Sequence, residues 1–208
     1  PRISAEQMLD HIAQLKGIGN KSERKELVAA LLEKVNLSKD KKKNLGGYSG
    51  GMKQRFGIAQ ALMGNPKLII VDEPTAGLDP AERNRFYNLL SQIGENTIVI
   101  LSTHIVEDVR TLCSDMAIIC EGQLMYNGKP DTAIDEIEGK IYSKTIVKED
   151  VSKYKGEYKI ISTQLKGGQL NIRIYSDTDP GNGFIQAPVV LEDFYFSKIA
   201  EKVDVVTL

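Results

Sequence analysis

Cysteine, long apolar runs and an excess of either charge are all scarce in this sequence. Its two cysteines, Cys113 and Cys120, stand in no metal-ligand spacing and fit a reducing cytosol. The longest apolar runs, residues 68–71 and 98–101, are too short to cross a bilayer. A net charge of −1 gives no general attraction to nucleic acid or to an anionic membrane. With 208 residues and an ordinary 41% of hydrophobic residues, the chain is predicted to form one core, or a core with a small appendage.

The most informative run is Tyr-Ser-Gly-Gly-Met-Lys-Gln-Arg at residues 48–55. Ser49 is predicted to cap a helix from about Gly50 to Met63. Gly50 and Gly51 carry no Cβ, so an oxyanion can approach the backbone N–H groups at this helix start. Taken alone, the run favours a capped helix that binds nothing.

Two apolar runs are followed by polar residues that can carry chemistry. Residues 68–71 precede Asp72 and Glu73, and residues 97–101 precede Ser102, Thr103 and His104. Both runs are continuous and rich in β-branched residues, which predicts buried parallel strands. Because open parallel sheets bind ligands at the carboxyl ends of their strands, these polar residues are expected at one edge. A phosphate-facing helix start and two carboxylates of different classes are typical of phosphoryl chemistry.

In this order and spacing, the motifs resemble those of the ATP-binding subunit of an ABC transporter, from the signature motif onward. Residues 48–52 resemble the Leu-Ser-Gly-Gly-Gln signature, with Met52 in place of glutamine. Residues 68–73 resemble the Walker B strand, residues 76–79 the D-loop, and His104 the switch histidine. The resemblance covers roughly residues 1–130.

The resemblance implies a role for each motif in binding and hydrolysing ATP with Mg²⁺. Asp72 would hold the metal through water, and Glu73 would orient or deprotonate the attacking water. His104 would contact the γ-phosphate and sense hydrolysis. The signature residues would contact ATP held by a second subunit, and the D-loop would lie at the subunit interface. The signature residues implied are Ser49, Gly50, Gly51 and Met52, and the D-loop residue is Asp79.

The predicted fold class is α/β, a partial P-loop NTPase core with a helical subdomain and a small C-terminal α+β extension. We expect a helical subdomain with the signature motif at 1–64, half of the ATPase core at 65–139 and an accessory region at 140–208. Ser4 and Gln7 form a predicted capping box for the first helix, followed by an apolar stripe of Met8, Ile12 and Leu15. In the accessory region, strands are expected at 140–147, 158–165 and 169–175, with a closing helix beginning in 187–196.

The phosphate-cradling sequence G-x-x-x-x-G-K-[ST], which this family needs, is absent from the 208 residues. The nearest run, residues 17–22, ends in Lys21-Ser22 but has Leu15 and Asn20 where glycines are required. We therefore expect this to be the C-terminal portion of a longer protein, whose phosphate loop lies upstream. Alone, it is expected to be inactive as an ATPase.

The resemblance also implies partners: a second ATP-binding subunit, identical or different, and a transmembrane permease, with no nucleic acid. The chain would be cytoplasmic, held at the inner face of the membrane through the permease. Residues 188–194 resemble the Pro-Thr-Leu-Glu-Asp-Val-Phe tail of the exporter branch. Two alternatives stay open: a DNA-associated ATPase, whose long coiled coils are not seen here, and a translation-associated protein, which usually holds two cassettes.

Overall fold

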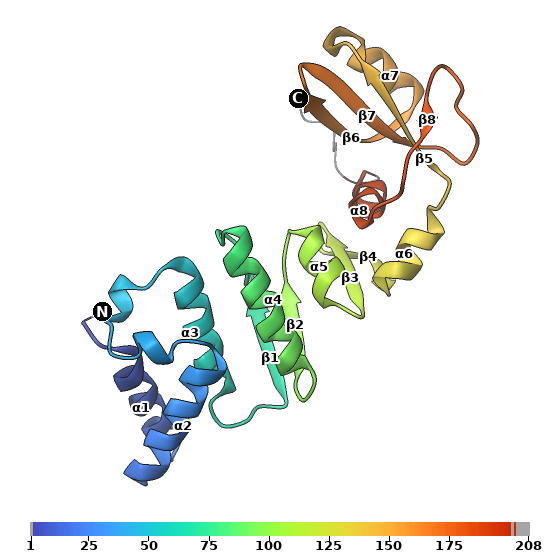
Figure 1. Cartoon of the computed structure of the whole chain (residues 1–208). Helices are drawn as coiled ribbons and strands as arrows, with labels where there is room; N and C mark the ends of the chain where they lie inside the picture. Colours follow the sequence, from blue (N-terminus) through green and yellow to red (C-terminus); the bar gives the residue numbers. More distant parts are fainter. Residues whose placement is uncertain (1, 201, 203–208) are drawn as a thin grey trace. The chain divides into compact units, whose positions relative to one another are not determined.

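A computed structural model describes residues 2–200 and 202, which form two compact units, Pro1–His104 and Ile105–Leu208 (Figure 1). The secondary structure is mixed α/β, as predicted. The predicted domain boundaries at residues 64 and 139 stay predictions, and residues 203–208 of the accessory region lie outside the described part. Among the described residues, no helix combines the length and apolar character needed to cross a membrane.

The first unit begins with a helical layer. Its capping box is confirmed, because Ser4 Oγ accepts a hydrogen bond from the Gln7 N–H and the Gln7 side chain accepts one from the Ser4 N–H. The buried positions of the first helix are Ala5, Leu9 and Ala13, one step from the predicted stripe, and Leu15 is exposed. The predicted stripe was wrong: Met8 and Ile12 are only half-buried, while Leu9 lies between the two alanines on the buried face. The elements are α1 (Ala5–Leu15), α2 (Lys21–Lys34), η1 (Ser38–Asp40), η2 (Leu45–Gly47) and α3 (Gly50–Leu62).

A two-stranded parallel sheet and one helix complete the first unit: β1 (Leu68–Asp72), α4 (Pro80–Gly94) and β2 (Ile98–Ser102). The parallel pairing is as predicted, running in register from Leu68 opposite Ile98. Full burial of the strands was wrong: Ile69 is buried, but Ile70 is 70% exposed. Because side chains alternate across a strand, one face of the pair packs on its own unit while the other carries exposed isoleucines. Ile98 and Ile100 share that exposed character.

The second unit opens with α5 (Val106–Leu112) and the hairpin of β3 (Met116–Cys120) and β4 (Gln123–Gly128). A four-stranded antiparallel sheet follows, in the order β6-β7-β5-β8. The two-residue turn between β6 and β7 has positive φ at Gly167 and Gly168, as a tight hairpin requires. The remaining elements are α6 (Pro130–Glu136), β5 (Ile141–Ile146), η3 (Lys148–Asp150), α7 (Val151–Glu157), β6 (Lys159–Lys166), β7 (Gln169–Tyr175), β8 (Ile185–Gln186) and α8 (Leu191–Ile199).

The four-stranded sheet is apolar on both faces. The successive residues Ile160 and Ile161 of β6 lie in different cores, because side chains alternate along a strand, and a β-bulge shifts the register between Ile160 and Ser162. Ile161 packs with Phe194 of α8, and Ile160 packs with Tyr154 of α7. The sheet therefore lies between helices, which fixes the positions of its strand ends.

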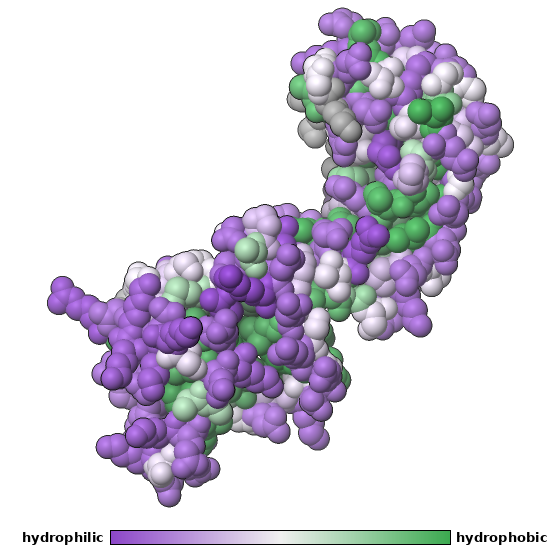
Figure 2. All heavy atoms as spheres, in the orientation of Figure 1, coloured by the Kyte–Doolittle hydropathy of each residue, from purple (hydrophilic) through white to green (hydrophobic). Residues whose placement is uncertain are grey.

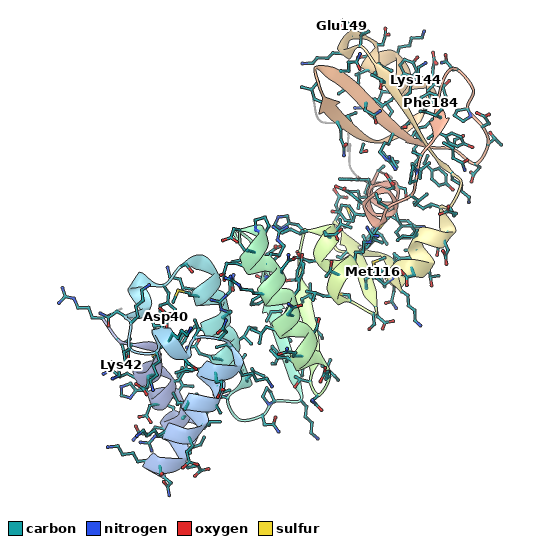
Figure 3. The ribbon with its side chains drawn as sticks, viewed as in Figure 1. Asp40, Lys42, Met116, Lys144, Glu149 and Phe184 are labelled. Atoms are coloured by element: carbon teal, nitrogen blue, oxygen red, sulfur yellow. The ribbon has the colours of Figure 1, made fainter. Side chains whose placement is uncertain are left out.

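Three aromatic rings and one lysine close the α7 side of the sheet. Tyr154 stacks on Tyr158 with ring centroids 5.9 Å apart, and Phe184 meets both rings. The Lys144 ammonium lies 4.8 Å from the Tyr154 ring centroid and 5.5 Å from that of Phe184, and Figure 3 labels Lys144 and Phe184 in this unit. Such cation–π contacts hold the Phe184 segment against the strands. On both units, the faces drawn in Figure 2 are mostly hydrophilic, with smaller apolar patches.

Candidate active site

The carboxyl ends of β1 and β2 bring polar groups together at one edge of the parallel pair. Asp72 lies opposite Ser102 in the register. The Ser102 hydroxyl donates a hydrogen bond to Asp72 Oδ1, and the Glu73 N–H donates to the Ser102 carbonyl oxygen at 2.9 Å. The structure thus gathers Asp72, Glu73 and the end of β2 at the edge where the sequence predicted them.

Glu73 and His104 are in direct contact at this edge. The distance from His104 Nδ1 to Glu73 Oε2 is 2.8 Å, and that oxygen is shielded from solvent. Nδ1 is thus the ring nitrogen that faces the carboxylate, which leaves Nε2 for another partner. The imidazole is 73% exposed and the Glu73 side chain 37% exposed. The pair therefore combines an oriented carboxylate with an accessible ring.

Glu73 also has a strained backbone. Its φ of 45° lies in the left-handed region, which costs a non-glycine residue on the order of 1–2 kcal/mol. The hydrogen bond from its N–H to Ser102 ties this conformation to the neighbouring strand. Strain of this kind persists only where the surrounding structure fixes it, and it is common at functional sites.

The segment after Glu73 is a compact loop that ends in a helix cap. Thr75 is fully buried, and Gly77 adopts a φ of 72° that favours glycine. Asp79 Oδ1 accepts a hydrogen bond from the Glu82 N–H at 2.9 Å, which makes Asp79 the N-cap of α4. One carboxylate oxygen of Asp79 is thus committed to the cap, and its predicted contact at a subunit interface stays a prediction.

The signature run forms the start of α3. Ser49 Oγ accepts a hydrogen bond from the Met52 N–H at 3.2 Å, as an N-cap does, and its hydroxyl proton is left to donate elsewhere. Gly50 is exposed, and no heavy atom lies within 4 Å of the position that a Cβ would take. Gly51 is buried, and a Cβ there would lie 2.4 Å from Glu82 Oε2. The two glycines therefore differ: Gly50 faces open space and Gly51 packs on α4.

Sequence reasoning missed the charged cluster that joins α3 to α4. Arg55 of α3 donates to Glu82 Oε2 of α4, and Arg85 reaches Oε1 of the same carboxylate at 2.5 Å. The Arg55 side chain is 10% exposed and that of Glu82 18% exposed. An arginine on a largely apolar helix is the sequence signal of such a pair, but its partner depends on how the helices cross.

The described residues suit one side of a nucleotide site. Ser49 and Gly50 offer a hydroxyl and open backbone at a helix start, where orphan N–H groups favour anions. No three or more His, Cys, Asp or Glu side chains gather into a metal-binding group in the part of the chain that the structure describes. Asp72 alone suits Mg²⁺, which is usually held by one or two carboxylates together with substrate phosphates. The residues thus fit ATP and Mg²⁺ as contacts from one side.

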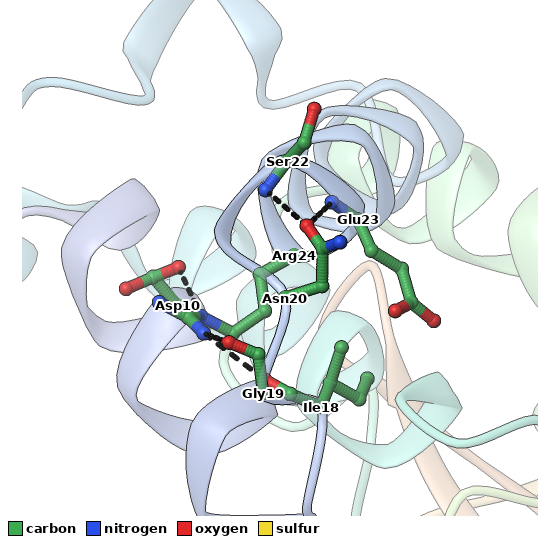
Figure 4. Close-up of polar contacts among 7 residues, drawn as sticks. All are labelled: Asp10, Ile18, Gly19, Asn20, Ser22, Glu23 and Arg24. Carbon is green, nitrogen blue, oxygen red and sulfur yellow. Dashed lines mark hydrogen bonds and ion pairs between the residues drawn. The ribbon is translucent and has the colours of Figure 1, made fainter.

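The run that came nearest to a phosphate loop has another structural role (Figure 4). Asn20 Oδ1 accepts hydrogen bonds from the N–H groups of Ser22 and Glu23, so Asn20 caps α2. The Arg24 guanidinium binds the carbonyl oxygens of Ile18 and Gly19 at 3.0 and 2.8 Å and pairs with Asp10. This run is a helix start whose N–H groups and carbonyls bind within the protein.

Comparison with known proteins identifies the class. The family model for ABC transporters matches residues 2–76. An uncharacterised ABC transporter ATP-binding protein of Bacillus subtilis, YxlF, is 35% identical over 127 residues, 61% of this chain and 43% of that protein. A Synechocystis protein with the same type of name is 36% identical over 140 residues, 66% of this chain and 39% of its own. ABC transporter A family member 8 of Dictyostelium discoideum is 36% identical over 126 residues, 61% of this chain and 15% of that protein.

Together with the mixed α/β fold, these matches make the chain similar to part of the ATP-binding proteins of ABC transporters. Residues 2–76, which match the ABC transporter family model, include the signature helix and the end of β1. The chain spans less than half the length of the relatives it matches.

Proposed function

We propose that this chain forms part of an ATP-hydrolysing subunit that drives transport across a membrane, in the export direction. The observation that supports the chemistry best is the 2.8 Å contact between Glu73 and His104 beside Asp72 at the sheet edge. The export direction is supported by residues 188–194, whose sequence is similar to the tail of exporter-type subunits. Transport and its direction are properties of the complete protein.

Glu73 is the proposed catalytic carboxylate. Bound MgATP supplies the phosphoryl group and the metal charge, while the protein positions water. Glu73 orients the attacking water and accepts its proton, and His104 holds the carboxylate through Nδ1. Nε2 of His104 is the nitrogen left to face the γ-phosphate. Asp72, which receives the Ser102 hydroxyl, is the proposed Mg²⁺ contact.

The start of α3 is proposed to bind phosphate oxygens of ATP held by a second subunit. Ser49 donates its hydroxyl proton, while Gly50 and Gly51 offer backbone N–H groups at the positive end of the helix. Gly50 allows the closest approach because the space above it is open. Met52 lies beside these residues, and Asp79 orients the loop that precedes α4. Two subunits would therefore share each ATP.

The remaining proposals concern the assembly. Because the 208 residues contain no phosphate-loop sequence, the isolated chain is proposed neither to bind MgATP tightly nor to hydrolyse it. The complete protein would pair with a second ATP-binding subunit and a permease. It would lie at the cytoplasmic face of the membrane through that permease.

A chimera tests the catalytic assignment. An N-terminal segment of an ABC subunit that carries a phosphate loop is joined to residue 1, and ATP hydrolysis is measured. We expect Glu73→Gln to lower kcat by about 100-fold or more, as loss of a general base does, while ATP binding persists. Glu95→Gln, an exposed glutamate at the end of α4, is the matched control and should leave kcat unchanged.

Two results would contradict the proposal. A Glu73→Gln chimera that hydrolyses ATP at close to the unsubstituted rate would remove Glu73 from the mechanism. Calorimetric titration that shows micromolar MgATP binding by the isolated 208-residue chain would contradict its dependence on a separate phosphate loop.

A further inference from the structure

Glu82 lies outside the signature and D-loop runs, yet it is bonded to both of them. It is the third residue of α4, and its N–H donates a hydrogen bond to Asp79 Oδ1 at 2.9 Å. Both oxygens of its carboxylate are used: Oε2 accepts from Arg55 of α3, and Oε1 accepts from Arg85 of α4 at 2.5 Å. One residue thus joins the signature helix to the loop that precedes α4.

The two arginines bonded to Glu82 differ in burial. The Arg55 side chain is 10% exposed and that of Arg85 is 60% exposed. Arg55 Nε is buried and has no hydrogen-bond partner among the described residues, while Nη1 forms the ion pair with Glu82. Losing one partner of a shielded pair leaves a charge uncompensated, whereas losing an exposed pair costs little. The pair with Arg55 is therefore the one that holds α3 against α4.

The Glu82 carboxylate also packs on the backbone of the signature run. A Cβ on Gly51 would lie 2.4 Å from Glu82 Oε2, so only glycine leaves room for the carboxylate at its present position. Gly51 and Arg55 are four residues apart and lie on the same face of α3, one turn from each other. Two contacts one turn apart fix both the position and the direction of the helix start relative to α4, which packs beside α3 in Figure 1.

The loop between Glu73 and α4 carries this connection on to the proposed catalytic carboxylate. The Ala76 N–H donates to the Glu73 carbonyl oxygen at 3.3 Å, and the Leu78 N–H donates to the Thr75 carbonyl oxygen at 3.2 Å. Thr75 and Leu78 are buried. Because the loop is packed and internally bonded, a shift of Asp79 is passed on to Glu73 and is not absorbed by loose chain.

We propose that Glu82 is a positioning residue that couples the start of α3 to Glu73 within one subunit. The inference rests on the proposed function, in which α3 and Glu73 of one subunit serve two different ATP molecules. Phosphate that binds at α3 moves Glu82 through the Arg55 pair and the Gly51 contact. Glu82 in turn moves the loop that begins at Glu73. Its role in the reaction is to make the placement of Glu73 at one ATP depend on the binding of the other.

Amide hydrogen exchange of the 208-residue chain tests the connection without ATP. Arg55→Gln removes the shielded ion pair, and the amides of Ala76, Leu78 and Glu82 are expected to exchange about tenfold faster or more. Arg85→Gln is the matched control, because it removes the same charge from the other oxygen of the same carboxylate. It should accelerate these amides by less than about threefold, and the amides of α2 should keep their rates in both variants. Equal acceleration by both variants, or acceleration that includes α2, would indicate a general loss of stability and overturn the proposal.

The chimera that carries a phosphate loop tests the consequence for hydrolysis. Glu82→Gln keeps the size of the side chain and removes its charge. It is expected to lower kcat by about tenfold and to reduce the cooperativity in ATP concentration, while KM changes by less than about threefold. Unchanged cooperativity in an active Glu82→Gln chimera would overturn this inference and leave the role of Glu73 standing. A Glu73→Gln chimera that keeps its activity would instead refute the proposed function, and the role of Glu82 in hydrolysis with it.

Discussion

The contact between Gly51 and Glu82 leads to a stability prediction for which the preceding residue, Gly50, is the control. A Cβ on Gly51 would lie 2.4 Å from Glu82 Oε2, 3.0 Å from Cδ and 3.1 Å from Cγ. An ordinary contact needs roughly 3.5 Å or more between heavy atoms. Gly51→Ala therefore forces the Glu82 carboxylate to move. Gly50, the preceding residue, has no atom within 4 Å of its Cβ position, so Gly50→Ala introduces no such contact.

Moving the Glu82 carboxylate weakens its ion pair with Arg55. Loss of a partner from a buried ion pair costs about 3–5 kcal/mol. Here Glu82 can keep its ion pair with Arg85 and is partly exposed, so we expect a smaller cost of about 2 kcal/mol. Alanine in place of glycine recovers up to about 1 kcal/mol of helix propensity. Gly51→Ala should therefore destabilise the protein by about 1–2 kcal/mol, while Gly50→Ala should be neutral or stabilising.

Urea unfolding followed by far-ultraviolet circular dichroism measures both variants, alone and combined with Glu82→Ala. Without the carboxylate, a Cβ at Gly51 meets no obstacle from Glu82, so Gly51→Ala should cost nothing in that background. The interaction energy from this double-mutant cycle should be about 2 kcal/mol. If Gly51→Ala costs the same with and without Glu82, or if Gly50→Ala costs as much as Gly51→Ala, the reasoning is wrong.

Three further predictions concern other groups of the chain. Ser49→Ala should destabilise the protein by about 1 kcal/mol and Ser49→Gly by only a few tenths, because glycine is a tolerable N-cap; equal losses in urea unfolding would contradict the cap. Tyr48→Phe removes the hydrogen bond from the hydroxyl to the Asp40 carbonyl oxygen, 3.0 Å away, and should cost about 1 kcal/mol; no change would show that the bond contributes nothing. Burial and the charge of Asp108 raise the pKa of the Cys113 thiol. The rate of its alkylation, measured by mass spectrometry of its peptide, should therefore have a pH midpoint above about 8.5. A midpoint at or below that value would contradict the prediction.

The sheet edge was predictable because its signals are local. An apolar β-branched run followed by Asp72 and Glu73 specifies a strand and the place where it ends. A second run before His104 specifies a parallel neighbour, and parallel strands share a carboxyl edge. The contact between Glu73 and His104 follows from these two facts together with the strand register. The capping positions of Ser4, Ser49 and Asp79 depend on short-range chemistry as well.

Features set by packing between elements were not predictable from the same signals. The helix at 130–136 begins with Pro130 at its first position, and no helix was predicted there. The exposure of Ile70 depends on which face of β1 other elements cover, and the apolar run is the same in either case. The buried face of the first helix depends on how closely its neighbours approach. In each case the residue types were compatible with two arrangements, and tertiary contacts chose one.

Glu82 shows how such a contact can matter for the site itself. Its N–H is bound by Asp79, its carboxylate by Arg55 of the signature helix, and its side chain packs on Gly51. The loop after Glu73 and the start of α3 are thus joined through one residue in neither motif. If phosphate binds at the start of α3 as proposed, a displacement there must move Glu82 or break a partly buried ion pair. Breaking it is costly, so the start of α4 should move with the signature helix.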